Sequence, residues 1–407
     1  MNTYRIRGGR CRRGSIMATV MAIVVLLLVL GVSMLTISLH GQTFAIRSNT
    51  QLVARSAADA GLEKVLCEMN QKLQVKPWSG GTLPSAADEA LANCNAVFSY
   101  SLEGDIGSGF NVAVTGQSAR AMSQINCLLK LHGPFESAIL TQGNLILKAG
   151  TVVSGYNSKV PSETNVKASI ATTSTVSASI VLNSGVTIDG DVLVGVDGNP
   201  SSVIKDLGAS VGDKLVMGEV PPFPSVVVPT LTDKGTSLKA IGTPIPIRPA
   251  DTGIYSSIEL KRTSEPGILT IEEGEVILEI TGDVKLGQDC EIVIAEGASL
   301  TLYLKGNLNS DNNSGFNNLT QIPGNLRIYG TSAATRSFDI KAKSKVFGAV
   351  YAPNADVTVY ASGDVYGSFV ARSFELKSGG NFYYDKALKE VTSDDPGTYF
   401  AVSQWHE

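Results

Sequence analysis

Apolar residues are distributed differently in the first 73 residues than in the rest of the chain. Residues 16–39 run for 24 positions without a charge, and 19 of these positions are apolar. At about 1.5 Å per residue this run makes a helix of roughly 36 Å, enough to cross a bilayer core. Beyond it, apolar residues recur at steps of three and four, the spacing of one helix face: Leu62, Val65, Leu66, Met69 and Leu73. We predict one helix over residues 15–73, with its first half in a membrane and its second half amphipathic outside. A secretory signal peptide is the alternative, but its apolar region is shorter and a small-residue cleavage site follows it.

Residues 74–134 change to an alternating pattern. After a loop with Pro77 and Pro84, apolar and polar residues alternate over residues 96–102, 110–114 and 122–131. Alternation of this kind is typical of strands with one buried face. We predict a small antiparallel sheet that the amphipathic half of the helix covers.

Residues 135–388 carry an internal repeat, clearest from Phe338 onward. Apolar residues stand at the first and third positions of each repeat and a further one at the ninth, and Gly348 and Gly367 stand at the eleventh position of the first two. The three aligned starts are Phe338, Val357 and Phe374, and the same template reappears at Leu145 and Ile180. A short repeat of strands and turns indicates coils that stack to bury their apolar faces. The sequence predicts a mainly β protein whose largest part is a parallel β-helix solenoid, right-handed by analogy with most such folds. A β-sandwich is the alternative, and it does not explain the shared register.

Two segments depart from the repeat. Residues 219–250 hold seven of the chain's 16 prolines. Proline cannot donate a ladder hydrogen bond, so we expect an extended excursion along the solenoid surface and no central strand. Residues 389–407 follow the last repeat and are expected to form a C-terminal tail.

The charge is distributed unevenly along the chain. The 33 Lys and Arg nearly balance the 37 acids, for a net charge of −4. Without the five arginines of residues 1–14, the remainder has a net charge of −9. This balance excludes a generally basic nucleic-acid binder. Positive charges before an apolar span keep that end in the cytoplasm, so we expect a single-pass protein in a bacterial inner membrane with the solenoid outside. The topology residues are Arg5, Arg7, Arg10, Arg12 and Arg13.

The N-terminus carries a resemblance to a known class. Residues 13–18, the apolar helix and residues 57–63 resemble the N-termini of PilX-type minor pilins and pseudopilins. The resemblance implies that a prepilin peptidase cuts between Gly14 and Ser15, and that the helix then packs against the helices of other pilins. Thr19 stands where pilins generally have Glu, and Ser15 where they generally have Phe. A Glu buried in an apolar bundle needs a partner, so a subunit without it is better suited to a minor, low-copy position.

The C-terminal part carries a second resemblance. Residues 323–330, 348–355 and 382–388 resemble uncharacterised bacterial β-helical domains that follow PilX-like N-termini. The resemblance implies an architecture and a surface location, and it brings no established activity.

The cysteines leave two alternatives open. Four of the five stand beyond the predicted membrane helix: Cys67, Cys94, Cys127 and Cys290. In an oxidising environment outside the membrane they could form one or two disulfides. A Cys67–Cys94 bond would tie the helix to the sheet and is our first choice, while four buried free thiols are the alternative.

Chemical motifs are sparse. The three histidines are His40, His132 and His406, far apart in sequence, with no metal-ligating or triad spacing. We expect no catalytic site, no bound metal and no cofactor.

The expected function is structural. The chain is predicted to be a type IV pilin-like subunit that displays its solenoid for pilus or secretion-system assembly, adhesion or binding of a partner such as a polysaccharide. One alternative is a surface β-helix enzyme or binding module that acts on polysaccharide, since equivalent residues of successive coils lie close together. The other is a cytoplasmic scaffold resembling the bactofilins, which the arginine-flanked helix opposes.

Overall fold

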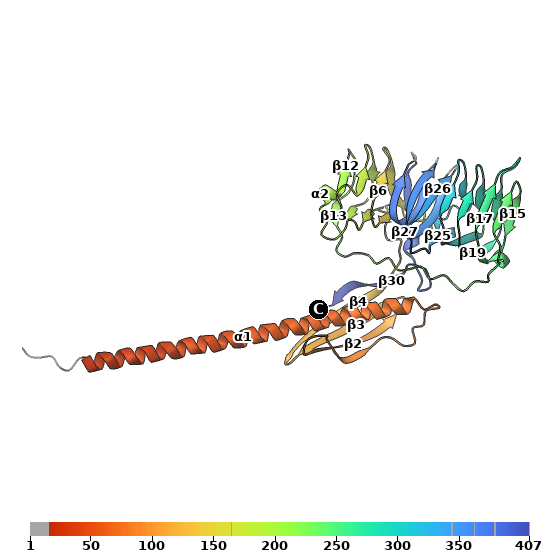
Figure 1. The fold of residues 1–407 in the computed structure, drawn as a ribbon. Helices are drawn as coiled ribbons and strands as arrows, with labels where there is room; N and C mark the ends of the chain where they lie inside the picture. The colour runs from red at the N-terminus through yellow and green to blue at the C-terminus, as the bar shows by residue number, and fades with distance from the viewer. Residues whose placement is uncertain (1–15, 164, 343–344, 362, 378–379, 407) are drawn as a thin grey trace, which may run out of the picture.

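The structure is a computed structural model that describes residues 16–163, 165–342, 345–361, 363–377 and 380–406. It contains a long N-terminal helix, a small antiparallel sheet and a large body of parallel strands (Figure 1). The chain is mainly β, as the sequence predicts. The proposed cleavage and topology residues lie outside the described residues: Arg5, Arg7, Arg10, Arg12, Arg13, Gly14 and Ser15.

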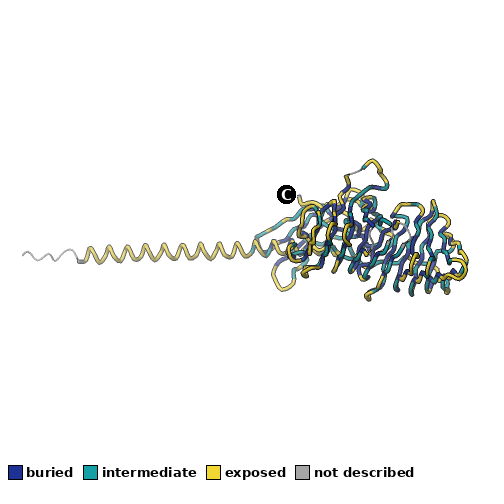
Figure 2. Tube along the Cα trace, turned by 90° about the horizontal axis from the view of Figure 1, so that it is seen from above, coloured by how far each residue is buried: buried dark blue, intermediate teal, exposed yellow. Residues whose placement is uncertain are grey.

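Helix α1, Ile16–Leu73, is continuous over 58 residues and has two different environments. Residues 17–49 are exposed around the whole helix, while the C-terminal part packs on the sheet (Figure 2). The buried face of this second part contains Leu62, Val65, Met69 and Leu73, with Leu66 partly buried beside it. The predicted amphipathic face is therefore confirmed.

The small sheet contains the three predicted strands, which run longer than expected, and two more. The strand order is β1-β2-β3-β4-β30, with every neighbour antiparallel. The strands are β1 (Ala86–Ala90), β2 (Ala96–Asp105), β3 (Gly109–Ser118), β4 (Ala121–His132) and β30 (Tyr399–His406). The sequence did not predict β1 or β30. Most of the expected C-terminal tail is thus a linker and an edge strand of the N-terminal sheet.

Small residues let the helix approach the sheet closely. Ala54, Ala57 and Ala58 of α1 are fully buried. They face Gly116 of β3, where an added Cβ would lie 2.1 Å from Ala54 O and 2.3 Å from Ala58 N. No side chain other than hydrogen fits at this contact. The helix position is therefore set by backbone packing against backbone.

The parallel body comprises the strands from β5 to β29, residues 139–385. Its first group is β5 (Ile139–Thr141), β6 (Leu145–Leu147), β7 (Val152–Tyr156), β8 (Ile170–Thr172), β9 (Ile180–Leu182), β10 (Thr187–Ile188), β11 (Val192–Val194), α2 (Pro200–Val203), β12 (Ile204–Asp206) and β13 (Lys214–Val216). The second group begins with β14 (Leu238–Ile241), β15 (Pro244–Ile247), η1 (Pro249–Asp251), β16 (Gly253–Tyr255), β17 (Ile258–Lys261), β18 (Ile268–Ile271), β19 (Gly274–Ile280), β20 (Val284–Leu286), β21 (Glu291–Ile294), β22 (Ala298–Leu304), β23 (Leu308–Ser310) and β24 (Gly315–Asn318). It ends with η2 (Pro323–Asn325), β25 (Leu326–Gly330), β26 (Arg336–Ala342), β27 (Val346–Ala361), β28 (Val365–Leu376), β29 (Phe382–Asp385) and η3 (Lys386–Lys389).

The strand pairing confirms the repeat register. Phe338 pairs with Val357, and Val357 pairs with Phe374. Leu145 continues the same ladder, since it pairs with Phe374 on one side and Ile180 on the other. All five side chains are buried in one apolar core. Because the strands of this body pair in parallel, the β-sandwich alternative is wrong.

The strands of the parallel body do not stack in chain order. The first strands, β5, β6 and β7, pair with β28 and β29, the last ones. The first group extends from there to β13, and the second extends in the opposite direction to β14 and β15 (Figure 1). The chain therefore enters and leaves the parallel body near its middle.

The proline-rich segment connects the two ends of the parallel body. We call residues 218–231 the strap. They run from the end of β13 towards β14, and so return along the whole body, as the predicted excursion requires. The predicted range of 219–250 is too long, because β14 and β15 already belong to the stack. β15 tolerates Pro244 and Pro246 because it is an edge strand with β18 as its neighbour.

Replacing Gly116 with Ala tests the close contact between helix and sheet. The added methyl group has to push α1 away, and overpacking of this kind costs about 1–3 kcal/mol. We expect a lower unfolding midpoint for the full chain in detergent micelles. Gly80→Ala is the control, because the nearest atom to its added Cβ is 3.9 Å away. Equal midpoints for the two variants would contradict this packing.

Candidate functional site

The exposed first part of α1 is a continuous apolar surface. It has the length and composition of a membrane-crossing helix. Two of its hydroxyl groups bond within the helix, since Ser33 donates to Val29 O at 2.7 Å and Thr36 donates to Val32 O at 2.5 Å. Such local bonds leave few polar groups that need water. The exposed side chains include Val20, Ile23, Val24, Leu27, Leu28, Leu30, Met34, Leu35 and Leu39.

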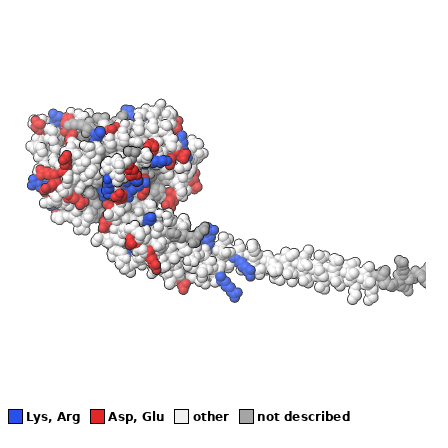
Figure 3. Space-filling view, turned by 180° about the vertical axis from the view of Figure 1, so that it is seen from behind, with Lys and Arg blue, Asp and Glu red and all other residues white. Residues whose placement is uncertain are grey.

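Charge is absent from this surface and returns near the sheet. Between residues 16 and 46 there is no Asp, Glu, Lys or Arg, and Figure 3 shows that length of helix without coloured side chains. Arg47 and Arg55 are the first charges after the apolar run. The apolar helix is therefore separated from the charged surface of the other two parts.

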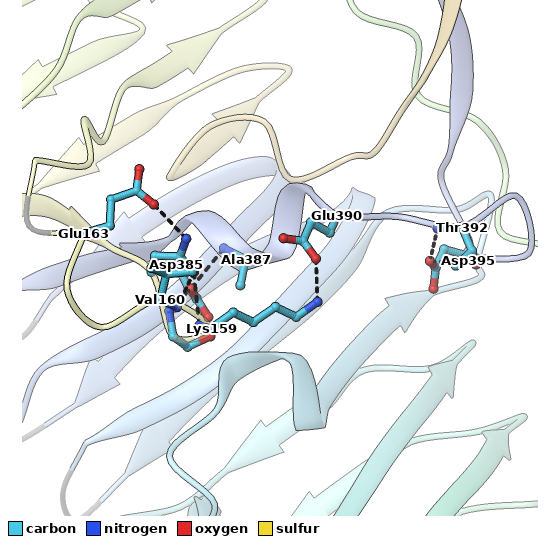
Figure 4. Close-up of polar contacts among 10 residues, drawn as sticks. Lys159, Val160, Glu163, Asp385, Ala387, Glu390, Thr392 and Asp395 are labelled. Carbon is cyan, nitrogen blue, oxygen red and sulfur yellow. Dashed lines mark hydrogen bonds and ion pairs between the residues drawn. The ribbon is translucent and has the colours of Figure 1, made fainter. Parts of the chain in front are cut away.

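A short turn joins the N-terminal part to the parallel body. Asp395 accepts a hydrogen bond from Arg327 of β25 at 2.8 Å, and also from Thr392 N at 2.6 Å (Figure 4). The neighbouring Asp394 accepts from Trp78 N at 3.0 Å. Lys76 donates to Ser393 O. The turn thus holds the loop after α1 and the parallel body at the same time.

Asn70 of α1 holds the last strand. Its side-chain amide donates to Phe400 O at 3.2 Å, and its side-chain oxygen accepts from Phe400 N at 2.7 Å. The carboxamide therefore pairs with both backbone groups of one residue, as a neighbouring strand would. The ring of Phe400 is buried against Phe110 and Trp78.

A polar cluster lies where the first strands of the parallel body meet the last ones. Asp385 caps η3 by accepting from Ala387 N at 3.1 Å, and it also accepts from Ser158 N at 2.9 Å (Figure 4). Two ion pairs span the same join: Lys159 with Glu390, and Lys386 with Glu163. Residues more than 200 positions apart are thereby fastened together.

Buried tyrosines lie beneath the strap. Tyr303, Tyr329 and Tyr351 follow one another on the paired strands β22, β25 and β27, with ring centroids 5.4 and 6.5 Å apart. The strap covers them with Phe223, Val226 and Val228. Burial raises the pKa of Tyr329 to about 12, and it also raises the pKa values of Tyr303 and Tyr351.

A cavity of about 280 Å³ lies between the first strap residues and the parallel body, and Tyr399 of β30 also lines it. Leu140, Met217, Phe223, Tyr351 and Tyr399 are among the residues that line it, so it is predominantly apolar. Burial, with help from the carboxylates of Glu136 and Glu219, raises the pKa of Tyr399 to about 12.

Lysine and tyrosine side chains lie side by side on the outer face of the parallel body. The ammonium groups of Lys341 and Lys377 each lie 5.5 Å from the ring centroid of Tyr360. Glu375 pairs with Lys377 at 3.3 Å. Lys377 therefore contacts both a ring and a carboxylate, and Lys341 shares the same ring.

A second depression on the outer face has a volume of about 360 Å³ and no aromatic lining. Its carboxylates are Glu259 and Asp311, and Glu259 pairs with Lys239 and Lys261. Within the described ranges, no three His, Cys, Asp or Glu side chains are arranged to hold a metal ion.

The cysteines do not form the expected bond in the structure. Cys67 and Cys94 are exposed, Cys127 and Cys290 are buried, and none of the four is in a disulfide. The thiol of Cys67 accepts a hydrogen bond from Gln71 at 3.3 Å. The alternative of four buried thiols therefore holds only for Cys127 and Cys290.

The sequence did not indicate the residues of the turn, the last strand and the cavity. Asn70, Asp395 and Tyr399 stand in no motif, and their partners are distant in sequence. The one usable signal was the run of four apolar residues from Tyr399 to Val402 in the expected tail.

Comparisons with known proteins cover parts of this architecture. A family described as a domain of unknown function (DUF7305) matches residues 249–391, less than half of the chain. No curated protein matches the chain. Among solved structures, the crystal structure of the competence-associated pilin ComZ from Thermus thermophilus matches with 16% sequence identity and a TM-score of 0.21. That match covers 88% of this chain and 97% of the other chain. A TM-score this low carries no conclusion about the role of this chain.

Substituting Asn70 with Ala should release β30. The variant leaves two backbone groups of Phe400 without partners, at a cost of about 1–3 kcal/mol. We expect faster amide hydrogen exchange across β30, measured by mass spectrometry of the full chain in detergent. Asn111→Ala, on an exposed position of β3, is the control. Unchanged exchange in β30 would show that Asn70 does not hold the strand.

Alkaline pH should loosen the join between the strap and the parallel body. The raised pKa values mean that folding favours neutral tyrosine, so this stability is complete below pH about 10. It is lost as the pH rises through the folded pKa of about 12 for Tyr329 and Tyr399. A titration that follows tyrosinate absorbance and circular dichroism together should show late ionisation coupled to loss of structure. Ionisation of these tyrosines near pH 10 in the folded protein would contradict the prediction.

Proposed function

We propose that the chain is a membrane-anchored, type IV pilin-like minor subunit. One observation carries the proposal: a single helix is apolar and exposed over its first part and packs on an antiparallel sheet over its second. This arrangement lets the exposed part insert into a membrane and also pack against similar helices. The resemblance of residues 13–18 and 57–63 to PilX-type proteins supports the same role.

The parallel body is, in this proposal, a right-handed β-helix displayed outside the inner membrane. Three parallel ladders support the β-helix assignment, and the right-handed preference of parallel crossovers supports its hand. Assembly into a pilus or secretion system, adhesion and partner binding are the roles we propose for it. A prepilin peptidase and other pilins are the proposed partners of the N-terminal helix.

We propose a non-enzymatic role for the outer face. The alternative of a polysaccharide-acting enzyme would be favoured by three convergent carboxylates or a basic pair in an aromatic-lined groove. Glu259 and Asp311 share a depression without aromatic residues, and Lys341 and Lys377 share one tyrosine ring. The bactofilin-like alternative would place the parallel body in the cytoplasm, where a protease added to intact spheroplasts could not reach it.

Cleavage between Gly14 and Ser15 is the first testable step. Mass spectrometry of the membrane-extracted protein should find a mature chain that begins at Ser15. Gly14→Val should block this cleavage, because the peptidase would have to accept a branched side chain at the scissile bond. Gly9→Val is the matched control and should be processed normally. A mature chain that still begins at Met1 would contradict the processing step.

A substitution within the apolar helix tests assembly. Leu27→Glu places an uncompensated charge at the centre of the exposed surface, at a cost of several kcal/mol in a bilayer or helix bundle. We expect that the Leu27→Glu chain, once processed, no longer co-purifies with a major pilin. Leu27→Val keeps the surface apolar and should retain it. Equal recovery of the pilin with both variants would count against assembly through this helix.

A further inference from the structure

The strap is an extended segment whose backbone is open. Among the described residues, the only hydrogen bond made by residues 218–231 is the one that Pro224 O accepts from the Tyr351 hydroxyl at 2.8 Å. Phe223, Val226 and Val228 fix the strap through apolar contacts with the tyrosines beneath it. The other N–H and C=O groups of the strap therefore lack protein partners, a state that exposed edge strands share.

The cavity beside the strap is suited to an apolar side chain. It has a volume of about 280 Å³, and its walls are Met217, Phe223, Tyr351 and Tyr399. Pro221 and Pro222 border it from the strap, so part of the strap backbone forms its rim. An extended segment that lay along the strap could place one side chain in this cavity.

The rim of the cavity is acidic. Glu136 and Glu219 both line it. Glu136 pairs with His132 at 3.4 Å and with Lys389 at 3.2 Å, whereas Glu219 has no ion-pair partner among the described residues. The sequence from residue 215 to residue 232 contains Glu219 and no Lys or Arg. A ligand at this place would meet uncompensated negative charge.

We propose that the strap and this cavity bind an extended peptide segment of a partner protein, in which an apolar side chain stands next to Lys or Arg. The peptide backbone would pair with the open groups of the strap, as in strand addition to a sheet edge. Its apolar side chain would fill the cavity and its cation would face Glu219. This inference deepens the proposed function, because it names the class of partner that a displayed parallel body would meet.

The test uses the full chain in detergent micelles and two labelled, capped hexapeptides. The first probe is Lys-Phe-Val-Lys-Val-Lys, and the second replaces each Lys with Glu. We expect the basic probe to bind at least about tenfold more tightly by fluorescence anisotropy, since a like-charge contact is strongly unfavourable. Glu219→Lys should weaken binding of the basic probe by about tenfold. Glu296→Lys makes the same charge change at another exposed turn and should leave binding unchanged.

Two further measurements test whether binding needs the cavity and the peptide backbone. They use a variant that fills the cavity and a small amine that competes with the probe. Met217→Trp should abolish binding while the unfolding midpoint of the chain stays the same; if this variant fails to fold, Glu219→Lys decides alone. Phenethylammonium carries the same apolar and cationic groups without a backbone, and it should compete weakly. Equal competition by the amine, equal binding of the two probes or the absence of binding would overturn the proposal. The measurement needs no cleavage or assembly, so its failure is distinguishable from failure of the pilin-like role.

Discussion

The pairing of the first parallel strands with the last ones determines the rest of this architecture. A parallel ladder leaves unpaired backbone groups at each end, so every strand depends on its neighbours for its hydrogen bonds and its buried face. Here Leu145 lies on Phe374, and both side chains belong to one continuous apolar core. Because the chain enters beside its own exit, its two connections to the small sheet leave from neighbouring strands.

This placement explains both the strap and the last strand. The parallel strands extend from the middle in two directions, so the chain has to return from β13 to β14 along the outside, and a proline-rich segment can do so without joining the ladders. The exit near the entry brings residues 399–406 back to β4, where they complete the N-terminal sheet. The helix then fixes that strand through Asn70, and the turn at Asp395 fixes the parallel body through Arg327. The parallel body is thus attached by two chain connections and several polar contacts.

Much of the fold was predictable because its signals are local. The apolar run ending at residue 39 and the spacing of Leu62, Val65 and Met69 define the two parts of α1. The repeat starting at Phe338 gave the register that the pairing confirms. The proline content of the strap excluded a central strand. In each case the signal lies within a short stretch of the sequence, so the pattern of residues reports their environment.

The contacts that form the candidate sites were not predictable in this way. Glu136, Glu219 and Tyr399 share one cavity although they stand in three distant segments, and none of them belongs to a motif. The pairing of Cys67 with Cys94 was a proposal from position alone, and the structure has both as free thiols.

The sequence by itself determined the element types, the apolar helix and the repeat register, because short-range periodicity encodes them. Only the tertiary structure decided that the parallel strands extend from the middle in both directions and that residues 399–406 complete the first sheet. These outcomes depend on which backbone edges meet across more than 200 residues, and no local pattern records that choice.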